Sequence, residues 1–287
     1  MAAEQSPTVR RRRLGHELRE LRERAGLTLE EAAALLDDFS AAKISRIETA
    51  KVRVRPGDVE ALLTAYGVQD VQQRANLITL TRESRQRGWW NRFTDAMSPL
   101  QDVAIGLEAE AVSIRTYSPQ VVSGVFQTES YARAVLKAIW ASEPSEHVER
   151  RVALRMARQE ILQHQDRLQI NSVIEDCVLR RPVGGYEILR EQLRRLAEVA
   201  ELPNISIRVL PLSVGAHPGH DGAFRIIDLS PPDPSVVHLE YPAGANYMER
   251  PGEVRLYSDI FERLEDLAMT SEESLELIIR LSGEKKA

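Results

Sequence analysis

Hydrophobic residues recur at helical spacing near the start of the chain. Four of them are separated by three or four positions: Leu14, Leu18, Leu21 and Ala25. This spacing places all four on one face of a helix. Gly26 follows and predicts the end of that helix, because glycine readily adopts the left-handed conformation of a helix stop.

Residues suited to helix capping precede each of the next apolar segments. Thr28 and Glu31 have the spacing of a capping box and predict the start of a second helix. Ser40 predicts the start of a third helix, Asp58 of a fourth and Asp70 of a fifth. The first part of the chain is therefore expected to form five short helices, the last of which fades near residue 87.

Two of these helices have the arrangement of a helix-turn-helix unit. They span Thr28–Leu36 and Ser40–Thr49 and are joined by a tight turn. At about 100° per residue, Ser40, Ile44 and Ile47 point inward. In such a unit the second helix lies in the major groove of DNA. The outward and flanking positions are Ala41, Ala42, Lys43, Ser45, Arg46 and Thr49.

These outward residues indicate how the helix would read DNA. Arg46 is the favoured base-reading residue, because its guanidinium fork matches guanine O6 and N7, a contact worth about 1–3 kcal/mol. Ala41 and Ala42 could touch a thymine methyl group, and Ser45 is a further expected base contact. A solvated basic face is the alternative interpretation. The residues expected to contact phosphates are Ser40, Lys43, Lys51, Arg53 and Arg55, with an added arm contact from Arg10, Arg11, Arg12 and Arg13.

The second half of the chain mixes helical and strand periodicity. Segments with helical spacing cover residues 99–112, 128–140, 145–165, 185–200, 252–269 and 271–283. Segments rich in Val and Ile predict strands over residues 169–180, 205–211, 222–229 and 236–241. Because the strands are grouped late and helices surround them, an α+β domain is favoured over a regular alternating βαβ array.

Two domains are expected, because 287 residues exceed the ~100–150 residues usual for one domain. The predicted fold is an all-α five-helix helix-turn-helix domain followed by an α+β domain that regulates, dimerises or binds a partner. Gly88, Trp89 and Trp90 begin the expected boundary. The predicted parts are a flexible arm (1–9), the helix-turn-helix domain (10–87), a linker (88–98) and the α+β domain (99–284).

The charge is unevenly distributed between the two parts. Residues 1–90 contain 16 Lys and Arg against 13 Asp and Glu, whereas the remaining residues contain 22 against 30. The overall net charge of −5 therefore hides a weakly basic first part. This asymmetry indicates that the first part meets phosphate and that the acidic second part has another role.

The chain has no feature of a secreted or membrane protein. No apolar run approaches the roughly 20 residues of a membrane span, and the arginine run precedes an amphipathic pattern instead of a secretory signal. A cytoplasmic location without membrane attachment is expected. Cys177 is the only cysteine, so a disulfide within the chain and a cysteine-based zinc site are excluded. It is expected to be a buried hydrophobic residue in a strand.

The helix-turn-helix segment resembles a known family. The runs Leu27–Ala33 and Ser40–Glu48 are similar to the xenobiotic-response-element (Cro/C1-type) helix-turn-helix family over roughly residues 10–70. The resemblance implies that Glu48 pairs with an arginine of the first helix, here Arg22, in a structural role. Leu29 departs from the family pattern, in which a polar residue often contacts phosphate. Alanines at 41 and 42 likewise replace the common glutamine-type base readers, so the operator sequence stays open.

The second half resembles the C-terminal domain of actinobacterial antitoxin-like (WhiJ-like) transcriptional regulators over about residues 100–283. The resemblance lies in Val125–Arg133, in Arg180–Gly185, and in Leu210 and Pro211 followed by Gly215–His217. It implies a role beside a small protein partner, and the family has no established catalytic residues.

Two loops of the second half are candidate sites. Arg180 and Arg181 end an expected strand, and Gly184 and Gly185 lead into a helix, so these groups could hold an anion or a partner carboxylate. A turn that needs glycine is the favoured alternative. The segment His217–Asp221 contains possible metal ligands, but its Pro and Gly favour a plain loop. The aromatic residues Tyr117, Phe126, Tyr131, Tyr186 and Tyr257 could line a pocket, although core packing is favoured.

The sequence supports three hypotheses about function. The leading one is a homodimeric repressor or antitoxin-like regulator that binds double-stranded DNA and a small protein partner. The second is a one-component regulator whose C-terminal domain senses a small-molecule ligand. The third is an enzyme tethered to DNA, which is disfavoured because no Gly-x-Ser-x-Gly, Walker or His-Glu-x-x-His motif occurs. We therefore expect no enzymatic activity, catalytic residue, cofactor or metal.

Overall fold

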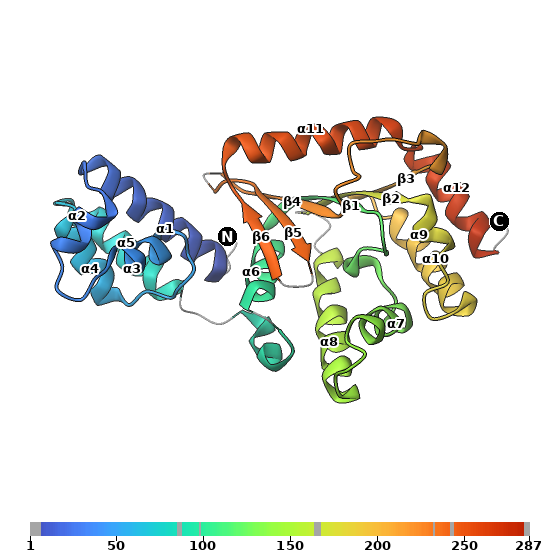
Figure 1. The fold of residues 1–287 in the computed structure, drawn as a ribbon, viewed down its shortest axis with the longest axis horizontal. Helices are drawn as coiled ribbons and strands as arrows, with labels where there is room; N and C mark the ends of the chain where they lie inside the picture. Colours follow the sequence, from blue (N-terminus) through green and yellow to red (C-terminus); the bar gives the residue numbers. More distant parts are fainter. Residues whose placement is uncertain are drawn as a thin grey trace. The chain divides into compact units, whose positions relative to one another are not determined.

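The computed structural model describes residues 7–84, 88–97, 99–163, 168–231, 233–241 and 244–283. The chain divides into two compact units, Met1–Asn91 and Arg92–Ala287 (Figure 1). The first is helical and the second combines a mixed sheet with helices, so the predicted fold class is confirmed.

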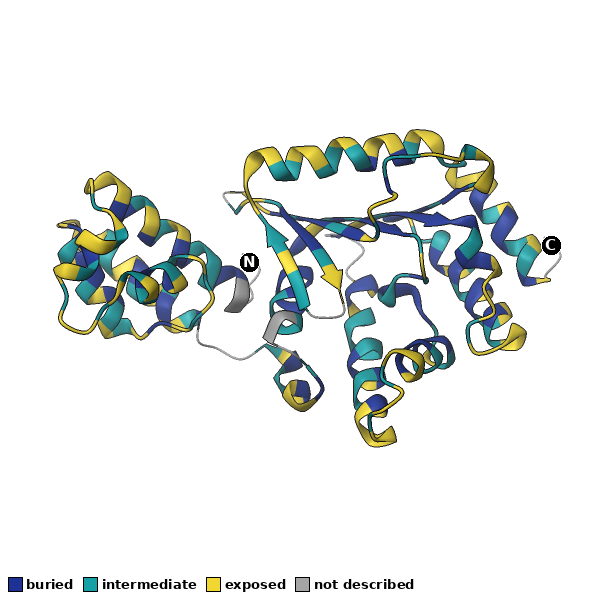
Figure 2. Cartoon of the chain, in the orientation of Figure 1, coloured by how far each residue is buried: buried dark blue, intermediate teal, exposed yellow. Residues whose placement is uncertain are grey.

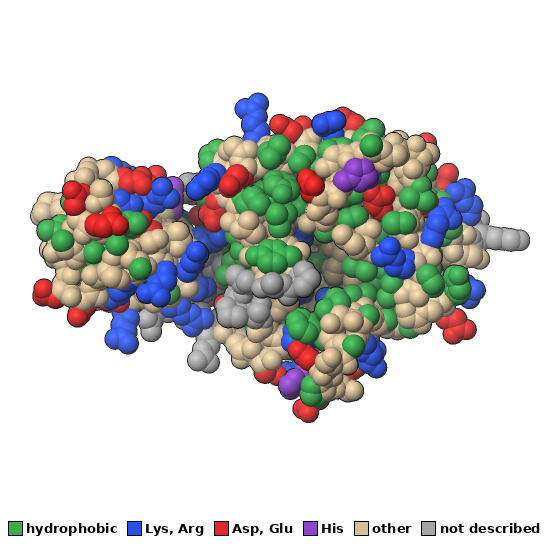
Figure 3. Space-filling view, viewed as in Figure 1, with side chains coloured by type: hydrophobic (Ala, Val, Ile, Leu, Met, Phe, Trp, Pro, Cys, Tyr) green, Lys and Arg blue, Asp and Glu red, His purple; other side chains and the backbone are tan. Residues whose placement is uncertain are grey.

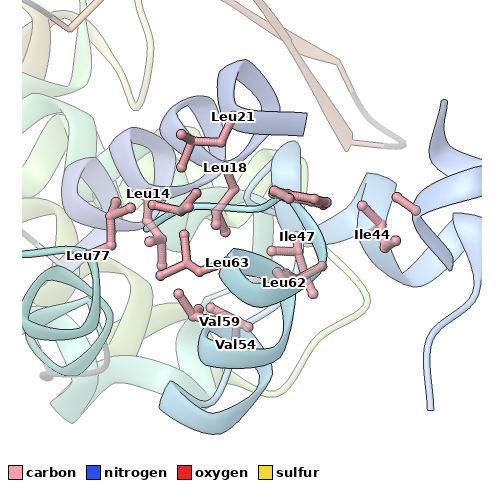
Figure 4. Packing of buried hydrophobic residues seen from close by; sticks show 13 residues of the cluster. Leu14, Leu18, Leu21, Ile44, Ile47, Val54, Val59, Leu62, Leu63 and Leu77 are labelled. Atoms are coloured by element: carbon pink, nitrogen blue, oxygen red, sulfur yellow. The ribbon is translucent and has the colours of Figure 1, made fainter. Parts of the chain in front are cut away.

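The N-terminal unit contains five α-helices in its described part, as the apolar pattern predicted. They are α1 (Pro7–Arg24), α2 (Leu29–Ala34), α3 (Ala41–Glu48), α4 (Pro56–Ala65) and α5 (Val71–Glu83). Their apolar faces meet in one core (Figures 2 and 4), which includes Leu14, Leu18, Leu21, Ile44, Ile47, Val59, Leu62, Leu63 and Leu77. Burial of these side chains explains why helices of only six to eighteen residues are stable.

Most of the predicted helix ends are confirmed. Thr28 and Glu31 form a capping box, and the side chain of Ser40 accepts a hydrogen bond from the Lys43 amide. Asp70 caps α5 through two backbone amides. The prediction for Asp58 is wrong: α4 begins earlier, at a proline whose ring already holds a helical φ angle. Asp58 lies in the first turn of α4, where its carboxylate accepts the amide of the residue that caps the helix.

The predicted flexible arm is wrong where the structure describes it. α1 begins at Pro7, and Val9 and Arg10 are buried; residues 1–6 lie outside the described part. Residues 10–13 are therefore part of α1, and Arg10 lies 3.5 Å from the Glu83 carboxylate of α5. Proline is favourable at the first helical position, and burial of Val9 extends the helix.

The C-terminal unit is built on one six-stranded sheet with the order β3-β2-β1-β4-β5-β6. The first three strands pair in parallel, and the other neighbours pair antiparallel. Parallel pairing needs the helical connections that follow β1 and β2, an arrangement that the grouped strand pattern did not indicate. The strands are β1 (Ala111–Ser118), β2 (Gln169–Glu175), β3 (Ile205–Leu210), β4 (Phe224–Leu229), β5 (Val236–Tyr241) and β6 (Gly244–Met248).

Helices cover both faces of this sheet (Figure 1). On one face, Phe261 and Leu264 of α11 pack against a core that contains Tyr117 and Phe224. On the other face α6 packs against β1 and β4 and α10 against β3. α12 lies at the edge of the sheet, where the side chain of Ser274 accepts a hydrogen bond from the Val209 amide of β3. The helices are α6 (Pro99–Glu108), α7 (Glu129–Ile139), α8 (Ser145–Arg158), α9 (Asp176–Arg180), α10 (Tyr186–Ala200), α11 (Pro251–Leu267) and α12 (Ser271–Ser282), with 3-10 turns at Trp89–Ala96, Gly124–Phe126, Gln159–Gln163 and Leu212–Val214.

Several predicted elements of this unit were wrong. β1 and β6 were not predicted as strands, since the former carries Ser, Arg and Thr and the latter is short and rich in small residues. Pairing with neighbouring strands, not local propensity, makes them strands. The segment 176–180 is helical instead of extended, and an ion pair between Asp176 and Arg180 spans its single turn. Cys177 consequently lies on a helix and is only partly buried.

The segment expected as a linker, residues 88–98, contains a 3-10 helix with buried Trp90 and Phe93. The division between the two units falls inside it. Arg150 of α8 binds Asp95 at 2.9 Å and also the carbonyl of Arg92 at 2.7 Å. These bonds fix the second half of the 3-10 helix, residues 92–96, to α8 of the C-terminal unit.

Gly15 sets the distance between α1 and α3. A Cβ atom at this position would lie 2.5 Å from the Glu48 carbonyl oxygen and 2.8 Å from that of Ile47. Both are backbone atoms, so they can move only if α3 shifts. We predict that Gly15→Ala destabilises the N-terminal unit by about 1–3 kcal/mol, measured by amide hydrogen exchange of α1 and α3 in the full chain.

Gly57 provides the matched control, because its added Cβ would meet no atom within 4 Å. Gly57→Ala in α4 should leave exchange unchanged or slow it, since alanine favours helix by about 1 kcal/mol over glycine. Equal exchange in wild type and Gly15→Ala would contradict the close approach.

Candidate nucleic-acid interface

The pair α2 and α3 forms the predicted helix-turn-helix unit. Ala32 of α2 is fully buried, as are Ile44 and Ile47 of α3, so the inner faces of both helices pack into the core. Ser40, expected to point inward, is instead exposed, because its hydroxyl caps α3. The expected orientation of α3 about its axis is otherwise confirmed.

The outer face of α3 carries the predicted base-reading residues. Ala42 and Arg46 are exposed, whereas Ala41 and Ser45 are partly buried. Arg46 Nε donates to the Ala42 carbonyl at 3.2 Å. This bond directs the guanidinium along the helix surface, and its two Nη groups are available for a partner outside the domain.

Lys43 has a contact set that the sequence did not predict. Its ammonium group lies 3.2 Å from Asp58 Oδ1, 3.3 Å from the Asp38 carbonyl oxygen and 3.8 Å from the centre of the Phe39 ring. These contacts tie α3 to the preceding turn and to α4. Lys43, expected to contact phosphate, therefore has partners within the domain.

The remaining predicted phosphate contacts lie on the loop after α3. Lys51, Arg53 and Arg55 are all exposed, and Figure 3 shows Lys and Arg side chains gathered along the lower side of the N-terminal unit. The amide of Lys51 donates to the Arg46 carbonyl at 2.8 Å, so the loop starts next to the residue predicted to read a base. The loop and the outer face of α3 thus form one continuous basic segment.

Ala50 allows this loop to turn back under α3. Its φ angle of 57° lies in the left-handed region, and its amide donates to the Ile47 carbonyl. This is the position at which helix ends usually carry glycine. The left-handed conformation costs an L-residue about 1–2 kcal/mol.

We predict that Ala50→Gly stabilises the N-terminal unit by up to about 1 kcal/mol, because it removes this strain. Calorimetric unfolding of the full chain measures the effect. Ala34→Gly, at the exposed last residue of α2, should have the opposite sign, because glycine is less favourable than alanine at a right-handed helical position. A destabilised Ala50→Gly would mean that the backbone is not strained there.

Arg22 and Glu48 form the buried ion pair that the family resemblance implied. Arg22 Nε and Nη2 donate to the two Glu48 carboxylate oxygens at 2.7 and 3.0 Å. A third bond runs from Nη1 to the Leu27 carbonyl at 2.7 Å. The hydrogen bond to Glu48 raises the pKa of Arg22. This pair joins α1 to the C-terminal end of α3 and to the loop before α2, and it neutralises a carboxylate close to the basic segment.

We predict that Glu48→Gln destabilises the N-terminal unit by about 3–5 kcal/mol, since it leaves the Arg22 charge buried without a counter-ion. Calorimetric unfolding measures this loss. The coupling between the two residues is measured separately, by a double-mutant cycle of Arg22→Met, Glu48→Leu and the double variant. The double variant should be more stable than the sum of the single changes implies. Additive effects of the two single changes would refute a direct coupling.

The two arginines of the expected anion site in the C-terminal unit bind other residues of the same unit. Arg180 binds both carboxylate oxygens of Asp176 at 3.0 Å, and Arg181 donates to the Gln120 carbonyl at 2.7 Å. Gly184 and Gly185 have φ angles of 72° and 106° at the start of α10. Both guanidiniums therefore have partners other than the N-terminus of α10, and the glycines serve the geometry of the turn.

The segment His217–Asp221 is a loop held by hydrogen bonds within it and by a contact with Glu175. His217 Nε2 lies 3.1 Å from Glu175 Oε1, which also accepts the Tyr117 hydroxyl at 2.6 Å. The Gly219 amide donates to His217 Nδ1 at 3.2 Å, and His220 Nε2 accepts the His217 amide at 3.3 Å. No group of three or more His, Cys, Asp or Glu suited to a metal occurs in the described part.

Four of the five aromatic residues singled out in the sequence pack in the core of the C-terminal unit, and one is exposed. Tyr117, Phe126 and Tyr131 are buried, and Tyr257 packs against Phe224 in the core. Tyr186 is 67% exposed at the start of α10. Core packing is thus confirmed for four of them and wrong for Tyr186.

An exposed arginine on the second helix of a helix-turn-helix unit, followed by a basic loop, is typical of a DNA-binding regulator. Comparison with known families agrees, since residues 13–77 match a helix-turn-helix domain. Residues 101–280 match a domain of unknown function, DUF5753. The chain belongs to the DUF5753 family.

No curated protein and no solved structure is significantly similar to this chain. Over the described residues, every helix falls short of the length and apolar character that crossing a membrane requires.

Proposed function

We propose that this protein is a sequence-specific transcription regulator that binds double-stranded DNA with α3 in the major groove. The observation that carries the proposal is the exposed Arg46 on the outer face of α3, a helix held from behind by the Arg22–Glu48 pair. In this arrangement Arg46 reads a guanine, with Ala41, Ala42 and Ser45 beside it. Lys51, Arg53 and Arg55 bind phosphates and set the position of the helix.

The proposal includes a homodimer in the cytoplasm. One helix-turn-helix reads only a half-site, and a two-fold dimer reads two half-sites about one DNA turn apart. The resemblance to the xenobiotic-response-element family supports this mode of binding. The role is one of binding, without enzymatic activity.

The resemblance of the second unit to WhiJ-like, antitoxin-like regulators supports a repressor that works with a small protein partner. Binding of that partner to the acidic C-terminal unit would couple its abundance to DNA occupancy. The second candidate is a one-component regulator that senses a small molecule, favoured by a cavity of about 350 Å³ lined by several arginines in the C-terminal unit.

The test is selection of genomic DNA fragments by the full chain at two salt concentrations. We expect a palindromic site. Arg46→Ala should lose about 1–3 kcal/mol of discrimination at one base position, roughly 5- to 150-fold. Lys51→Ala should weaken all sequences alike and reduce the salt dependence by about one phosphate contact.

Arg82→Ala is the matched control, because Arg82 is an exposed arginine on α5, outside the helix-turn-helix pair. It should change neither the selected sequence nor its affinity. Selection of the same site with the same affinity by Arg46→Ala would exclude Arg46 as the base-reading residue. The absence of any enriched site would contradict binding by the chain alone.

A further inference from the structure

The most unusual charge arrangement of the C-terminal unit lies between α8 and the strands β4 and β5. A cavity of about 350 Å³ is lined there by Arg155, Arg158, Arg225 and His238, with Trp140 among its other walls. A second hollow of about 230 Å³ is lined by the same three arginines and by His238. We call the first of these spaces the arginine cavity. Its size lies within the range of roughly 300–1,000 Å³ that is typical of small-molecule sites.

One buried carboxylate serves two of the arginines. Arg158 Nη2 lies 2.6 Å from Glu108 Oε1, and Arg225 binds the same oxygen atom. Only 2% of the Glu108 side chain is exposed. Nearby Glu240, 3.6 Å from Arg225, is 61% exposed, so water screens its charge.

Arg155 has only a neutral partner. Its Nη1 donates to Gln127 Oε1 at 2.8 Å, and no ion pair within 4.0 Å joins it to a carboxylate of the described residues. Burial and the neighbouring Arg158 lower the pKa of Arg155 to about 10, so it still carries its charge at neutral pH.

His238 adds no positive charge to the cavity. Burial, together with the nearby Arg225, lowers the pKa of His238 to about 2. The neutral ring accepts a hydrogen bond from Arg225 Nη2 at its Nδ1, over 2.9 Å. This bond fixes the orientation of the Arg225 guanidinium and uses one of the N–H donors of its Nη2.

Four guanidiniums line the cavity. Arg151 pairs with Glu143, and Arg158 and Arg225 share the buried Glu108, whereas Arg155 donates to the neutral Gln127. The wall carboxylates of Asp95 and Glu240 are 58% and 61% exposed, so water screens their charge. Uncompensated charge in a buried position is unfavourable unless a counter-ion joins it. A phosphate monoester carries about 1.5 to 2 negative charges at neutral pH and accepts several charge-assisted hydrogen bonds. Such a group would compensate the charge of Arg155 and the positive charge that the single carboxylate shared by Arg158 and Arg225 leaves over, and the guanidinium fork matches phosphate oxygens.

The walls of the cavity indicate the rest of the ligand. Trp140 is partly buried and stacks with Arg151 at 4.2 Å, and Met97 and Ala104 line the same space. These side chains suit an apolar or aromatic group of a small organic molecule.

We propose that the arginine cavity binds a small organic phosphate monoester through Arg155, Arg158 and Arg225. Arg155 is the residue for which the ligand would serve as counter-ion, because Arg158 and Arg225 already share Glu108. The inference concerns the C-terminal unit alone and does not depend on DNA binding.

The test is calorimetric titration of the full chain, without DNA, at constant ionic strength. The probes are phenyl phosphate, inorganic phosphate and benzoate. We expect phenyl phosphate to bind, inorganic phosphate to bind more weakly and benzoate to bind least. Arg155→Gln should weaken phenyl phosphate binding at least tenfold, and Arg155→Lys should retain part of it.

Thermal unfolding of the free protein separates a ligand-binding role from a structural one. Arg155→Gln should raise the midpoint of the free protein, because it removes an uncompensated charge, and should abolish the increase caused by phenyl phosphate. Arg190→Gln is the control for charge loss, since Arg190 is exposed on α10. Arg190→Gln should change neither the unfolding midpoint of the free protein nor the increase caused by phenyl phosphate.

Three results would overturn the proposal. They are the absence of phenyl phosphate binding, tighter binding of benzoate than of phenyl phosphate, and unchanged phenyl phosphate binding by Arg155→Gln. None of them bears on the selection of DNA by Arg46. Likewise, failure to select DNA would leave phosphate binding by the cavity intact.

Discussion

The ion pair between Arg22 and Glu48 determines where α3 lies, and the candidate DNA surface depends on α3. The pair fixes the C-terminal end of α3 to α1, and Gly15 lets the two helices approach until backbone atoms meet. Arg46 can therefore extend from a helix whose inner face and end are both held. Because the pair is buried, its charges cannot be released to water, and α3 is held in one orientation.

Buried charge has opposite consequences in the two units. In the N-terminal unit the buried Arg22 guanidinium has the Glu48 carboxylate and the Leu27 carbonyl as partners, and the pair holds α3 in place. In the C-terminal unit Glu108 is shared between Arg158 and Arg225, while Arg155 has an amide as its partner among the described residues. Complete compensation indicates a structural role, and incomplete compensation in a cavity indicates a binding role.

The arginine cavity left only a faint trace in the sequence. Arg151, Arg155 and Arg158 recur at helical spacing along α8, on a helix that also buries Val148 and Val152. Such a row usually lies on a solvated face, and nothing local distinguishes a buried row from an exposed one. Its counter-ion Glu108 lies 50 residues away from Arg158 and 117 from Arg225, so no short motif contains the cluster.

The features that could be predicted from the sequence are those that depend on nearby residues. Capping at Thr28, Ser40 and Asp70, the glycine stop at Gly26 and the apolar faces of the five helices all act within one or two helical turns. The outward face of α3 followed from the same local signals, whereas the two-domain organisation was predicted from the length of the chain.

Features that depend on distant partners could not be predicted before the fold was known. β1 and β6 became strands through pairing, and the helical turn after β2 depends on where the sheet ends. The engagement of Lys43 with Asp58 and the shared use of Glu108 likewise required the chain to be folded. Strand pairing and charge compensation are interactions between segments far apart in the chain, whereas periodicity and capping belong to single segments.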